Sequence, residues 1–292
     1  MRVMLVPNDL YEESVEDARL LEEWLDERDV DVVRAPTYGF DGAASLDGVD
    51  LVVSMGGDGT LLRAAHLVGD REIPILGLSY GHLGFLTYNR EGRRDAGRDD
   101  GGDRDLYEVV AAALSQELRQ SRRAVLEIRV RGCDSRGREV ERVAHALNEI
   151  VLARGASGKM VEFDVGANGA PIDRLRGDGF VVATATGSTG YALSAGGPIV
   201  TPDFKGMVCV PLAPHTITAR AFLTAPSDVV ELDVVGDRSF DPCLFADGER
   251  LFPDLVPESL QVLRGPFDTV LLTGGGDDFF ASVSRVFYGK VR

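Results

Sequence analysis

The 292-residue sequence has only three cysteines, almost no lysine and no long apolar run. Cys133, Cys209 and Cys243 are widely spaced and form no Cys-x-x-Cys pair, which argues against a disulfide framework or a cysteine metal site. No apolar run approaches the roughly 20 residues of a membrane-spanning helix. The start, MRVMLVPND, is typical of a first strand rather than of a signal peptide. We therefore expect a cytoplasmic protein with no membrane partner.

The sequence is acidic, and its basic residues are almost all arginines. Only Lys159, Lys205 and Lys290 are lysines among 31 basic residues, and the net charge is −16. A body of this charge repels nucleic acid, so we expect no such partner. Many aspartates with little lysine resemble proteins from salt-loaded cytoplasm and predict a halophilic prokaryote, although a GC-rich genome also produces an arginine bias. An anionic phosphorylated substrate would then need backbone N–H donors or locally concentrated positive charge, with salt screening the general repulsion.

The first part of the chain alternates between strand and helix patterns. Strands are expected at MRVMLV, VDVV, DLVVSM and IPILGL, and helices at residues 13–28, 61–68 and 105–119. This alternation predicts an α/β domain with a parallel sheet over residues 1–120. In such sheets ligands bind beyond the carboxyl ends of the strands, where GGDGT (residues 56–60) falls.

From residue 121 the pattern changes to short β-rich runs. AVLEIRVRG, RVAHALNEIVLARG, KMVEFDVGANG, GFVVATAT, DVVELDVVG and PCLFADG follow one another with turn signals and little helix. They predict a mostly-β second domain over residues 121–272. The charged, glycine-rich segment 91–105 is expected to be a solvated loop. The last segment, DDFFASVSRVFYGKVR, has apolar spacing that fits either a helix or an edge strand.

The GGDGT turn places one carboxylate, Asp58, among three glycines at the end of a strand. Glycine lets a backbone N–H approach a ligand oxygen closely, and a helix N-terminus adds further donors for phosphate. The spacing is neither Gly-x-Gly-x-x-Gly nor a lysine P-loop, and Arg63 is the cation one turn into the helix. The plain alternative is a tight turn in which Thr60 or Asp58 caps the helix.

Three later segments carry polar residues where a structural role alone is a weaker explanation. PILGLSYGHLGFLT contains His82 and Phe85, and LNEIVLARG contains Asn148 and Glu149. LRGDGFVVATATGSTGYALSAGGPIV holds Arg176, Asp178 and Tyr191. Each has a plain alternative: Asn-Glu as an edge feature, Asp178-Gly179 as a hairpin turn, and Tyr191 as a core aromatic.

Together, GGDGT, GHLGFLT, the Asn-Glu pair, RGDG, TATGSTGYALSAGGPIV and PLAPHTITAR strongly resemble the NAD kinases over about residues 52–248. The first motif is shared with diacylglycerol-kinase-like and phosphofructokinase-like enzymes, whereas the later motifs are not. The resemblance implies a NAD kinase/diacylglycerol kinase-like fold, with residues 273–292 completing the first domain. It also implies transfer of a phosphoryl group from ATP or polyphosphate to the 2′-hydroxyl of the adenosine ribose of NAD.

The resemblance assigns roles residue by residue. Asp58 would accept the proton of that hydroxyl, and Mg²⁺ or another divalent cation would accompany ATP, with no metal-ligating residue assigned. A homodimer or homotetramer is implied, with the NAD site at the subunit boundary and Lys159 reaching NAD from a neighbour. The implied NAD-binding residues are Asp58, Gly59, Phe85, Asn148, Glu149, Lys159, Arg176, Asp178, Thr189, Gly190, Tyr191, Ala192, Leu193 and Ser194. The expected donor-binding residues are Gly56, Gly57, Gly59, Thr60 and Arg63.

Two positions depart from the family's Thr-Pro-Thr-Gly-Ser-Thr-Ala-Tyr turn: Ala185 replaces the proline and Gly190 the alanine. Both changes predict a looser backbone where adenine should stack. Two other functions stay open. A lipid or sphingoid kinase would need an apolar groove and leaves Asn148 and Glu149 unexplained. A nucleotide-binding regulator without activity would not require the carboxylate of Asp58.

Overall fold

The computed structural model describes residues 1–35, 46–80, 84–88, 106–235, 241–274 and 279–289. These residues form two compact units. Unit 1 comprises Met1–Arg122 and Thr269–Arg292, and unit 2 comprises Arg123–Asp268. The chain passes from one unit to the other within two long strands, β5 (Arg119–Asp134) and β16 (Leu255–Thr273). The last strand therefore returns the chain to the unit in which it began.

Unit 1 is built on a parallel sheet in the order β2-β1-β3-β4-β16. Its first four strands are β1 (Arg2–Pro7), β2 (Asp31–Arg34), β3 (Leu51–Gly56) and β4 (Ile75–Ser79). Every residue of β3 and β4 is buried, as expected when helices cover both faces of a sheet. The predicted α/β domain with a parallel sheet is confirmed.

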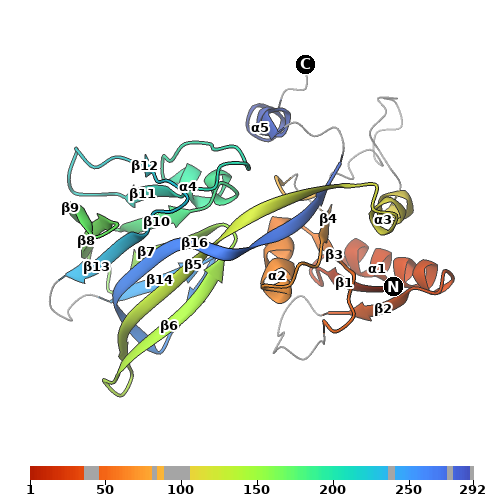
Figure 1. Ribbon diagram of the computed structural model, residues 1–292, viewed down its shortest axis with the longest axis horizontal. Coiled ribbons are helices and arrows are strands. Elements are labelled where there is room, and N and C mark those ends of the chain that lie inside the picture. The colour runs from red at the N-terminus through yellow and green to blue at the C-terminus, as the bar shows by residue number, and fades with distance from the viewer. Residues whose placement is uncertain (36–45, 81–83, 89–105, 236–240, 275–278, 290–292) are drawn as a thin grey trace. The chain divides into compact units, whose positions relative to one another are not determined.

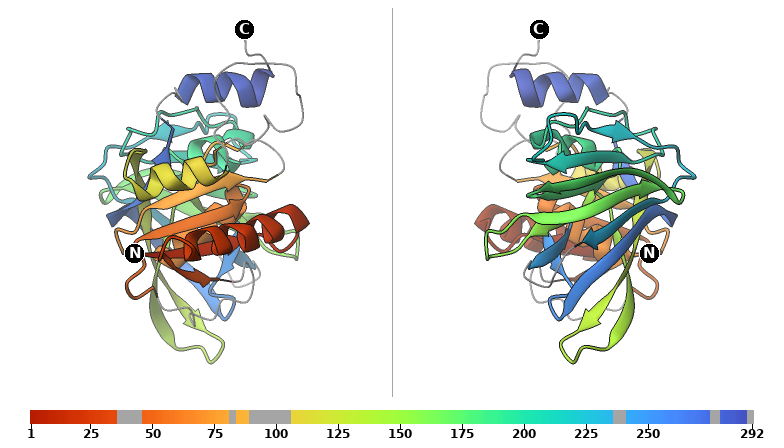
Figure 2. Two further views of the ribbon diagram at one scale, coloured as in Figure 1. Left: turned by 90° about the vertical axis from the view of Figure 1, so that its right-hand side faces the viewer. Right: turned by 90° about the vertical axis from the view of Figure 1, so that its left-hand side faces the viewer.

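Helices cover both faces of this sheet (Figure 1). Helices α1 (Glu12–Asp26) and α3 (Leu106–Leu114) share one face, as the left view of Figure 2 shows, and Trp24 contacts Tyr107 there. Helix α2 (Asp58–Val68) follows β3 and buries its own apolar stripe on the other face. The final helix, α5 (Phe279–Tyr288), belongs to the same unit, so the last segment forms a helix and not an edge strand.

The helix predicted for residues 105–119 ends earlier, at Leu114, so that prediction is wrong at its C-terminus. Gln116 adopts a left-handed conformation with φ 57°, which a helix cannot continue through. The N–H of Glu117 then bonds the carbonyl of Ala112 and closes the helix end. Periodicity did not reveal this stop because no glycine or proline marks it.

Unit 2 is mostly β, as predicted. One group of strands contains β13 (Val230–Val235), β8 (Val161–Ala167) and β9 (Ala170–Gly177) beside β16, together with the pair of β5 and β6 (Glu139–Ala146). A six-stranded sheet has the order β12-β11-β10-β7-β14-β15. Its strands are β7 (Glu149–Arg154), β10 (Gly179–Ala183), β11 (Val208–Leu212), β12 (Phe222–Leu223), β14 (Pro242–Ala246) and β15 (Glu249–Leu251).

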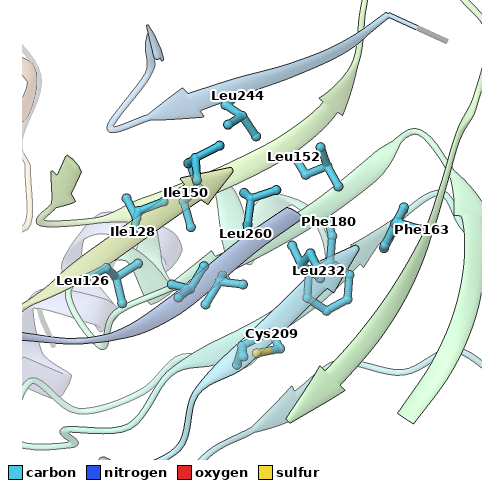
Figure 3. Packing of buried hydrophobic residues seen from close by; sticks show 14 of the residues in the cluster. Leu126, Ile128, Ile150, Leu152, Phe163, Phe180, Cys209, Leu232, Leu244 and Leu260 are labelled. Atoms are coloured by element: carbon cyan, nitrogen blue, oxygen red, sulfur yellow. The ribbon is translucent and has the colours of Figure 1, made fainter. Parts of the chain in front are cut away.

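The core of unit 2 lies where residues from both groups of strands meet (Figure 3). Phe163 and Phe180 contact edge to face, with ring centroids 5.8 Å apart, and both are fully buried. Alternate residues of β7, such as Ile150 and Leu152, point into this cluster. The other face of β7 packs against a second apolar cluster containing Val151 and Val181. Because both of its faces are covered, β7 is a rigid support for the residues at its ends.

Within the described ranges, no helix combines the length and the apolar character that crossing a membrane requires.

Candidate active site

The GGDGT turn joins β3 to α2 in unit 1. Gly57 is the N-cap of α2, and no side chain makes a capping hydrogen bond there. The alternative in which Thr60 or Asp58 caps the helix is therefore wrong. Asp58 is instead the first helical residue, at the carboxyl end of a buried parallel strand. Its negative charge is favoured at this position by the helix dipole.

The Asp58 carboxyl group is held by the backbone of another segment. Its Oδ2 accepts the N–H of Phe85 at 3.0 Å and its Oδ1 accepts the N–H of Leu86 at 3.2 Å. A Cβ placed on Gly84 would lie 2.1 Å from Oδ1, so only glycine fits beside this carboxyl group. The motif GHLGFLT thus has a geometric role: its second glycine permits the approach, and the next two residues donate. His82 lies outside the described residues.

These surroundings act on the pKa of Asp58 in opposite directions. Burial raises the pKa above its usual value, and the N–H groups of Phe85 and Leu86 lower it in part. The net result is a raised pKa, which brings the carboxylate nearer to the range of an effective general base. Each carboxylate oxygen also has more than one lone pair, so accepting one N–H still allows a hydroxyl to be accepted.

The segment Gly84–Tyr88 is docked on β4. The N–H of Tyr88 bonds the carbonyl of Gly77, and the N–H of Ser79 bonds the carbonyl of Tyr88. A Cβ on Gly77 would lie within 3.2 Å of the Leu86 carbonyl, so the segment lies flat on the strand. The ring of Phe85 contacts Phe287 of α5, with centroids 5.3 Å apart. The two donors to Asp58 therefore sit on a supported piece of backbone.

The remaining residues of the turn divide into packed and open positions. Thr60 is 3% exposed, and its hydroxyl accepts the Asn8 side-chain N–H at 3.1 Å. A Cβ on Gly56 would lie 2.2 Å from that hydroxyl, which is a packing reason for this glycine. At Gly57 and Gly59 a Cβ would meet no atom within 4 Å, so this side of the turn has room. The donor-binding roles of these residues and of Arg63 stay predictions.

In unit 2, Asn148 and Glu149 stand at the start of β7. Asn148 precedes the strand, and β7 is an interior strand between β10 and β14, so the pair is not an edge feature. Glu149 is 7% exposed. The side-chain atoms Asn148 Oδ1 and Glu149 Oε2 are both buried without a hydrogen-bond partner. Unsatisfied buried oxygens are costly, and a ligand with hydroxyl or amide donors would satisfy them.

Asp247, in the turn after β14, organises this pair. Its carboxylate accepts the backbone N–H groups of Leu147, Asn148 and Glu149 at 2.8, 2.7 and 3.1 Å. Its own N–H bonds the Glu149 carbonyl at 3.0 Å. Burial, reinforced by the negative charge of Asp247, raises the pKa of Glu149 to about 7, against the lowering effect of the Tyr191 N–H. Glu149 is therefore partly protonated near neutral pH.

The TATGSTGY turn wraps around the same pair. The N–H of Thr184 bonds the Asn148 carbonyl at 2.8 Å, and a Cβ on Gly187 would lie 2.2 Å from that oxygen. Tyr191 begins the short helix α4 (Tyr191–Ser194) and is 48% exposed, so it is not a core aromatic. The structure thus brings Asn148 and Glu149 together with the segment that contains Thr189, Gly190, Tyr191, Ala192, Leu193 and Ser194.

The departure at Gly190 has a specific consequence. Gly190 has φ −92° and ψ −132°, a backbone conformation of neither a helix nor a strand. A Cβ at this position would lie 3.3 Å from Glu149 Oε2. The missing methyl group therefore leaves space beside the Glu149 carboxyl. Ala185 is buried, and its carbonyl accepts the Ser188 hydroxyl at 2.7 Å.

Three predicted NAD-binding residues lie at the other end of β7. In the register of β7 with β10, Ala183 is opposite Glu149 and Gly179 is opposite Ala153. Asp178, one residue before Gly179, therefore lies about 16 Å along the sheet from Glu149, at about 3.3 Å per residue. Asp178 forms an ion pair with Arg154 at 2.9 Å, and Arg176 and Lys159 are exposed near this end. Asp178 is not in a hairpin turn, because β9 and β10 pair with different strands.

Several residues that shape the site were missed from the sequence. Asn8, Gly84, Leu86, Arg154 and Asp247 make contacts described above; Gly84 and Leu86 lie in the GHLGFLT motif, and two of the others had a local signal. The turn dipeptides Asp-Gly at residues 247–248 and Asn-Asp at residues 8–9 mark strand ends. Neither dipeptide indicates which distant backbone the side chain meets.

The described residues contain no group of three or more His, Cys, Asp and Glu side chains placed to hold a metal ion. Both oxygens of Asp58 already accept backbone N–H groups. The described residues therefore offer no ready-made set of side-chain ligands for a divalent cation.

The chain matches two domain models of one family. Residues 41–93 match the ATP-NAD kinase N-terminal domain, and residues 147–273 match the ATP-NAD kinase C-terminal domain. A NAD kinase of Alcanivorax borkumensis is 32% identical over 286 residues, covering 94% of this chain and 90% of that protein. A NAD kinase of Geobacter metallireducens is 36% identical, covering 80% of this chain and 77% of that protein.

Solved structures agree in fold. The crystal structure of an NAD kinase from Archaeoglobus fulgidus in complex with ATP has a TM-score of 0.72 and 26% identity, covering 99% of this chain and 98% of that chain. The crystal structure of yeast NADH kinase complexed with NADH has a TM-score of 0.83 at 21% identity, covering 100% of this chain and 89% of that chain. The resemblance carried by the GGDGT, Asn-Glu and TATGSTGY segments is thereby confirmed, and the chain belongs to the ATP-NAD kinase family of phosphotransferases.

Proposed function

We propose that this protein transfers the terminal phosphoryl group of ATP to the 2′-hydroxyl of the adenosine ribose of NAD, producing NADP. The observation that carries the proposal is the pair of buried oxygens without partners, Asn148 Oδ1 and Glu149 Oε2. They lie in the motif that the family resemblance assigns to NAD, and ribose hydroxyls are donors of the kind they lack. The match to the C-terminal domain model, which includes this motif, favours NAD over a lipid or sphingoid alcohol.

Asp58 is the proposed proton acceptor. Its carboxylate is oriented by two backbone N–H groups, and its pKa is raised by burial. Phosphoryl transfer passes through a loose transition state, so the main contributions are positioning and the neutralisation of charge. A carboxylate in a fixed orientation can hold the attacking hydroxyl in line and take its proton as the oxygen loses charge.

The phosphate donor is proposed to meet the start of α2, where Gly57 and Gly59 leave the backbone open. Helix N-termini supply N–H donors and a favourable dipole for phosphate. A divalent cation such as Mg²⁺ would enter with ATP as part of the substrate, because ATP phosphates supply most of its ligands. We assign it no protein ligand and no separate step.

The two groups of predicted NAD-binding residues support an oligomer. Asn148 and Glu149 lie at one end of β7, whereas Arg176, Asp178 and Lys159 lie near the other. We propose that a second copy of the chain supplies the second group to the NAD bound by the first, in a homodimer or homotetramer. Sedimentation of the purified protein measures the subunit number, and a monomer that is fully active would contradict this assignment.

The experiment is NADP formation by the purified protein, with ATP and polyphosphate tried separately and with NAD or NADH as acceptor. Each assay is run in dilute buffer and in molar KCl, because a halophilic origin is still a prediction from the charge pattern. Asp58→Asn should lower turnover by about 10²–10⁴-fold, the usual contribution of a positioned general base, while NAD binding persists.

Asp70→Asn is the matched control, since Asp70 is exposed just beyond the end of α2. It should leave turnover unchanged. NAD binding without turnover in every condition would contradict the kinase and favour the nucleotide-binding regulator. Neither binding nor turnover would show that NAD is not the substrate.

A further inference from the structure

We propose that Asp247 positions the Asn148–Glu149 pair, both by fixing the backbone from Leu147 to Glu149 and by placing one negative charge beside the Glu149 carboxyl group. Asp247 would not touch the substrate itself and would act only through its two neighbours. The proposal rests on the assignment of NAD to this pair. Asp247 would thus determine how the pair is oriented and at which pH Glu149 ionises.

Backbone hydrogen bonds fix the start of β7 to Asp247. Three consecutive N–H groups, those of Leu147, Asn148 and Glu149, converge on one carboxylate. The N–H of Asp247 returns a bond to the Glu149 carbonyl, so the two chain segments are tied in both directions. Hydrogen bonds to an ionised acceptor are about twice as strong as neutral ones. Asn148 lies between β6 and β7, outside the sheet ladders, and so depends on such bonds for its orientation.

The turn that carries Asp247 is itself constrained. Asp247 has φ 49°, a left-handed conformation that aspartate tolerates better than most residues, and Gly248 follows with φ 83°. The pairing of β14 with both β7 and β15 fixes the two ends of this turn. A carboxylate in this turn is therefore aimed at the start of β7 by the sheet on either side.

The Asp247 carboxylate also acts on Glu149 through its charge. Glu149 is 7% exposed, and its Oε2 has no partner, so its charge is poorly compensated. Burial and the nearby Asp247 carboxylate both raise the pKa of Glu149. Two like charges in a shared site disfavour ionisation of the more buried one. Glu149 is the buried member of the pair, whereas the Asp247 carboxylate accepts three backbone N–H groups.

The other elements around Glu149 offer little competing charge in the described structure. Strand β10, which pairs with it, has the sequence GFVVA and carries no ionisable side chain. Strand β14 carries the Cys243 thiol, opposite Ala153 near the far end of β7. The Tyr191 backbone N–H bonds the Glu149 carboxyl, and Glu249 and Arg250 follow the Asp247 turn as exposed residues. After burial, Asp247 is thus the neighbouring charge that raises the pKa of Glu149.

The experiment separates charge from geometry with two variants. Asp247→Asn removes the charge and replaces one acceptor oxygen by a donor, whereas Asp247→Glu keeps the charge and displaces it. The titration midpoint of Glu149 is measured in substrate-free protein by carbon-13 NMR of labelled glutamate, with Glu149→Gln to assign the signal. NAD dissociation constants are measured at pH 8 by calorimetry, where Glu149 is mostly ionised in the wild type.

We expect Asp247→Asn to move the Glu149 midpoint to lower pH and to weaken NAD binding by about tenfold, the factor for one lost charge-assisted bond. Asp247→Glu should weaken NAD binding while the midpoint stays near that of the wild type. Asp228→Asn is the matched control, because Asp228 also accepts a backbone N–H in a turn of unit 2, from Ala225, away from this pair. It should lower the melting temperature and change neither readout.

A lower melting temperature in Asp247→Asn, with an unchanged midpoint and unchanged NAD affinity, would reduce Asp247 to a structural residue and overturn the proposal. If Asp247→Asn does not fold, unchanged NAD affinity in Asp247→Glu overturns the positioning role. If the wild type binds no NAD, the proposed function fails, whereas the midpoint measured without substrate still decides the electrostatic part.

Discussion

The two units hold an important carboxyl group by different means. In unit 1, Asp58 follows a parallel strand, and its two oxygens accept N–H groups from a neighbouring segment. In unit 2, Glu149 begins an antiparallel strand, and it is the neighbouring Asp247 that accepts most of the local N–H groups. Burial raises the pKa in both cases, and backbone N–H groups oppose the rise at both, but a second carboxylate adds to it only at Glu149.

This difference matches the roles that we propose. A proton acceptor must keep one orientation and be ionised in the resting enzyme, and two backbone donors favour both conditions. A group that binds hydroxyls by accepting their hydrogens needs a free oxygen more than a full charge. Glu149 Oε2 has no hydrogen-bond partner, whereas each oxygen of Asp58 accepts one backbone N–H and keeps a lone pair for the reacting hydroxyl. Three substitutions test the comparison, beginning with the largest expected effect.

Gly84→Ala should disrupt the unit 1 arrangement most severely. The added Cβ would lie 2.1 Å from Asp58 Oδ1 and 2.5 Å from its Cγ, so the carboxyl group must rotate away from its N–H donors. We expect a loss of turnover of about 100-fold or more, similar to the loss of a positioned general base, measured as NADP formation. NAD binding by the residues of unit 2 should be retained.

The double variant Gly84→Ala/Asp58→Asn provides the control. If Gly84 acts through Asp58, the second substitution adds little to the first, because residues that act as a unit are not additive. Multiplicative losses would mean that Gly84 affects turnover by another route.

Glu149→Gln tests the unit 2 arrangement through stability. The folded-state pKa of about 7 lies above the ordinary value of 4.5. Ionisation of Glu149 therefore leaves the unfolding free energy of the wild type unchanged below pH 4.5 and lowers it increasingly as the pH rises to about 7. Well above pH 7 the total loss of unfolding free energy is about 3 kcal/mol, as an order of magnitude. The variant should therefore gain stability relative to the wild type on going from pH 5 to pH 8, as measured by thermal unfolding without NAD. An equal difference at the two pH values would contradict the raised pKa.

Phe287→Ala is expected to have the smallest effect. Phe287 supports the ring of Phe85, whose backbone N–H holds Asp58, and an aromatic contact contributes about 0.5–1.5 kcal/mol. Turnover should fall by about two- to tenfold, and Phe287→Tyr should restore it. Phe280→Ala is the matched control, since Phe280 lies on the same helix, is 61% exposed and contacts Phe279. Equal losses in both variants would indicate a general effect of α5.

Local patterns predicted much of the fold. The alternation of strands and helices over residues 1–120 and the turn-separated β runs that follow match the observed elements in order and type. The helix end at Leu114 was missed because Gln116 in a left-handed conformation has no strong sequence signal. Asn148 was expected inside a strand, yet it lies between β6 and β7, because apolar residues on both sides hid the break.

The candidate site was only partly predictable. Motifs identified Asp58, Asn148, Glu149 and Tyr191, whereas residues that orient them carry ordinary local patterns. Gly84 lies in the GHLGFLT motif, but only the structure shows that a Cβ there would lie 2.1 Å from Asp58. The separation of Arg176 and Asp178 from Glu149 was also not predictable, since it depends on the register of β7 with β10.

The sequence by itself determined the class of fold, the order of its elements and the family, because periodicity, turn residues and motif spacing are local properties of the chain. Only the tertiary structure decided which groups meet: Phe85 and Leu86 at Asp58, and Asp247 at the start of β7. Asp247 is 98 to 100 residues from the N–H groups that it accepts. The raised pKa of Glu149 depends on the contact with Asp247 and on burial, and both arise only when distant strands pair.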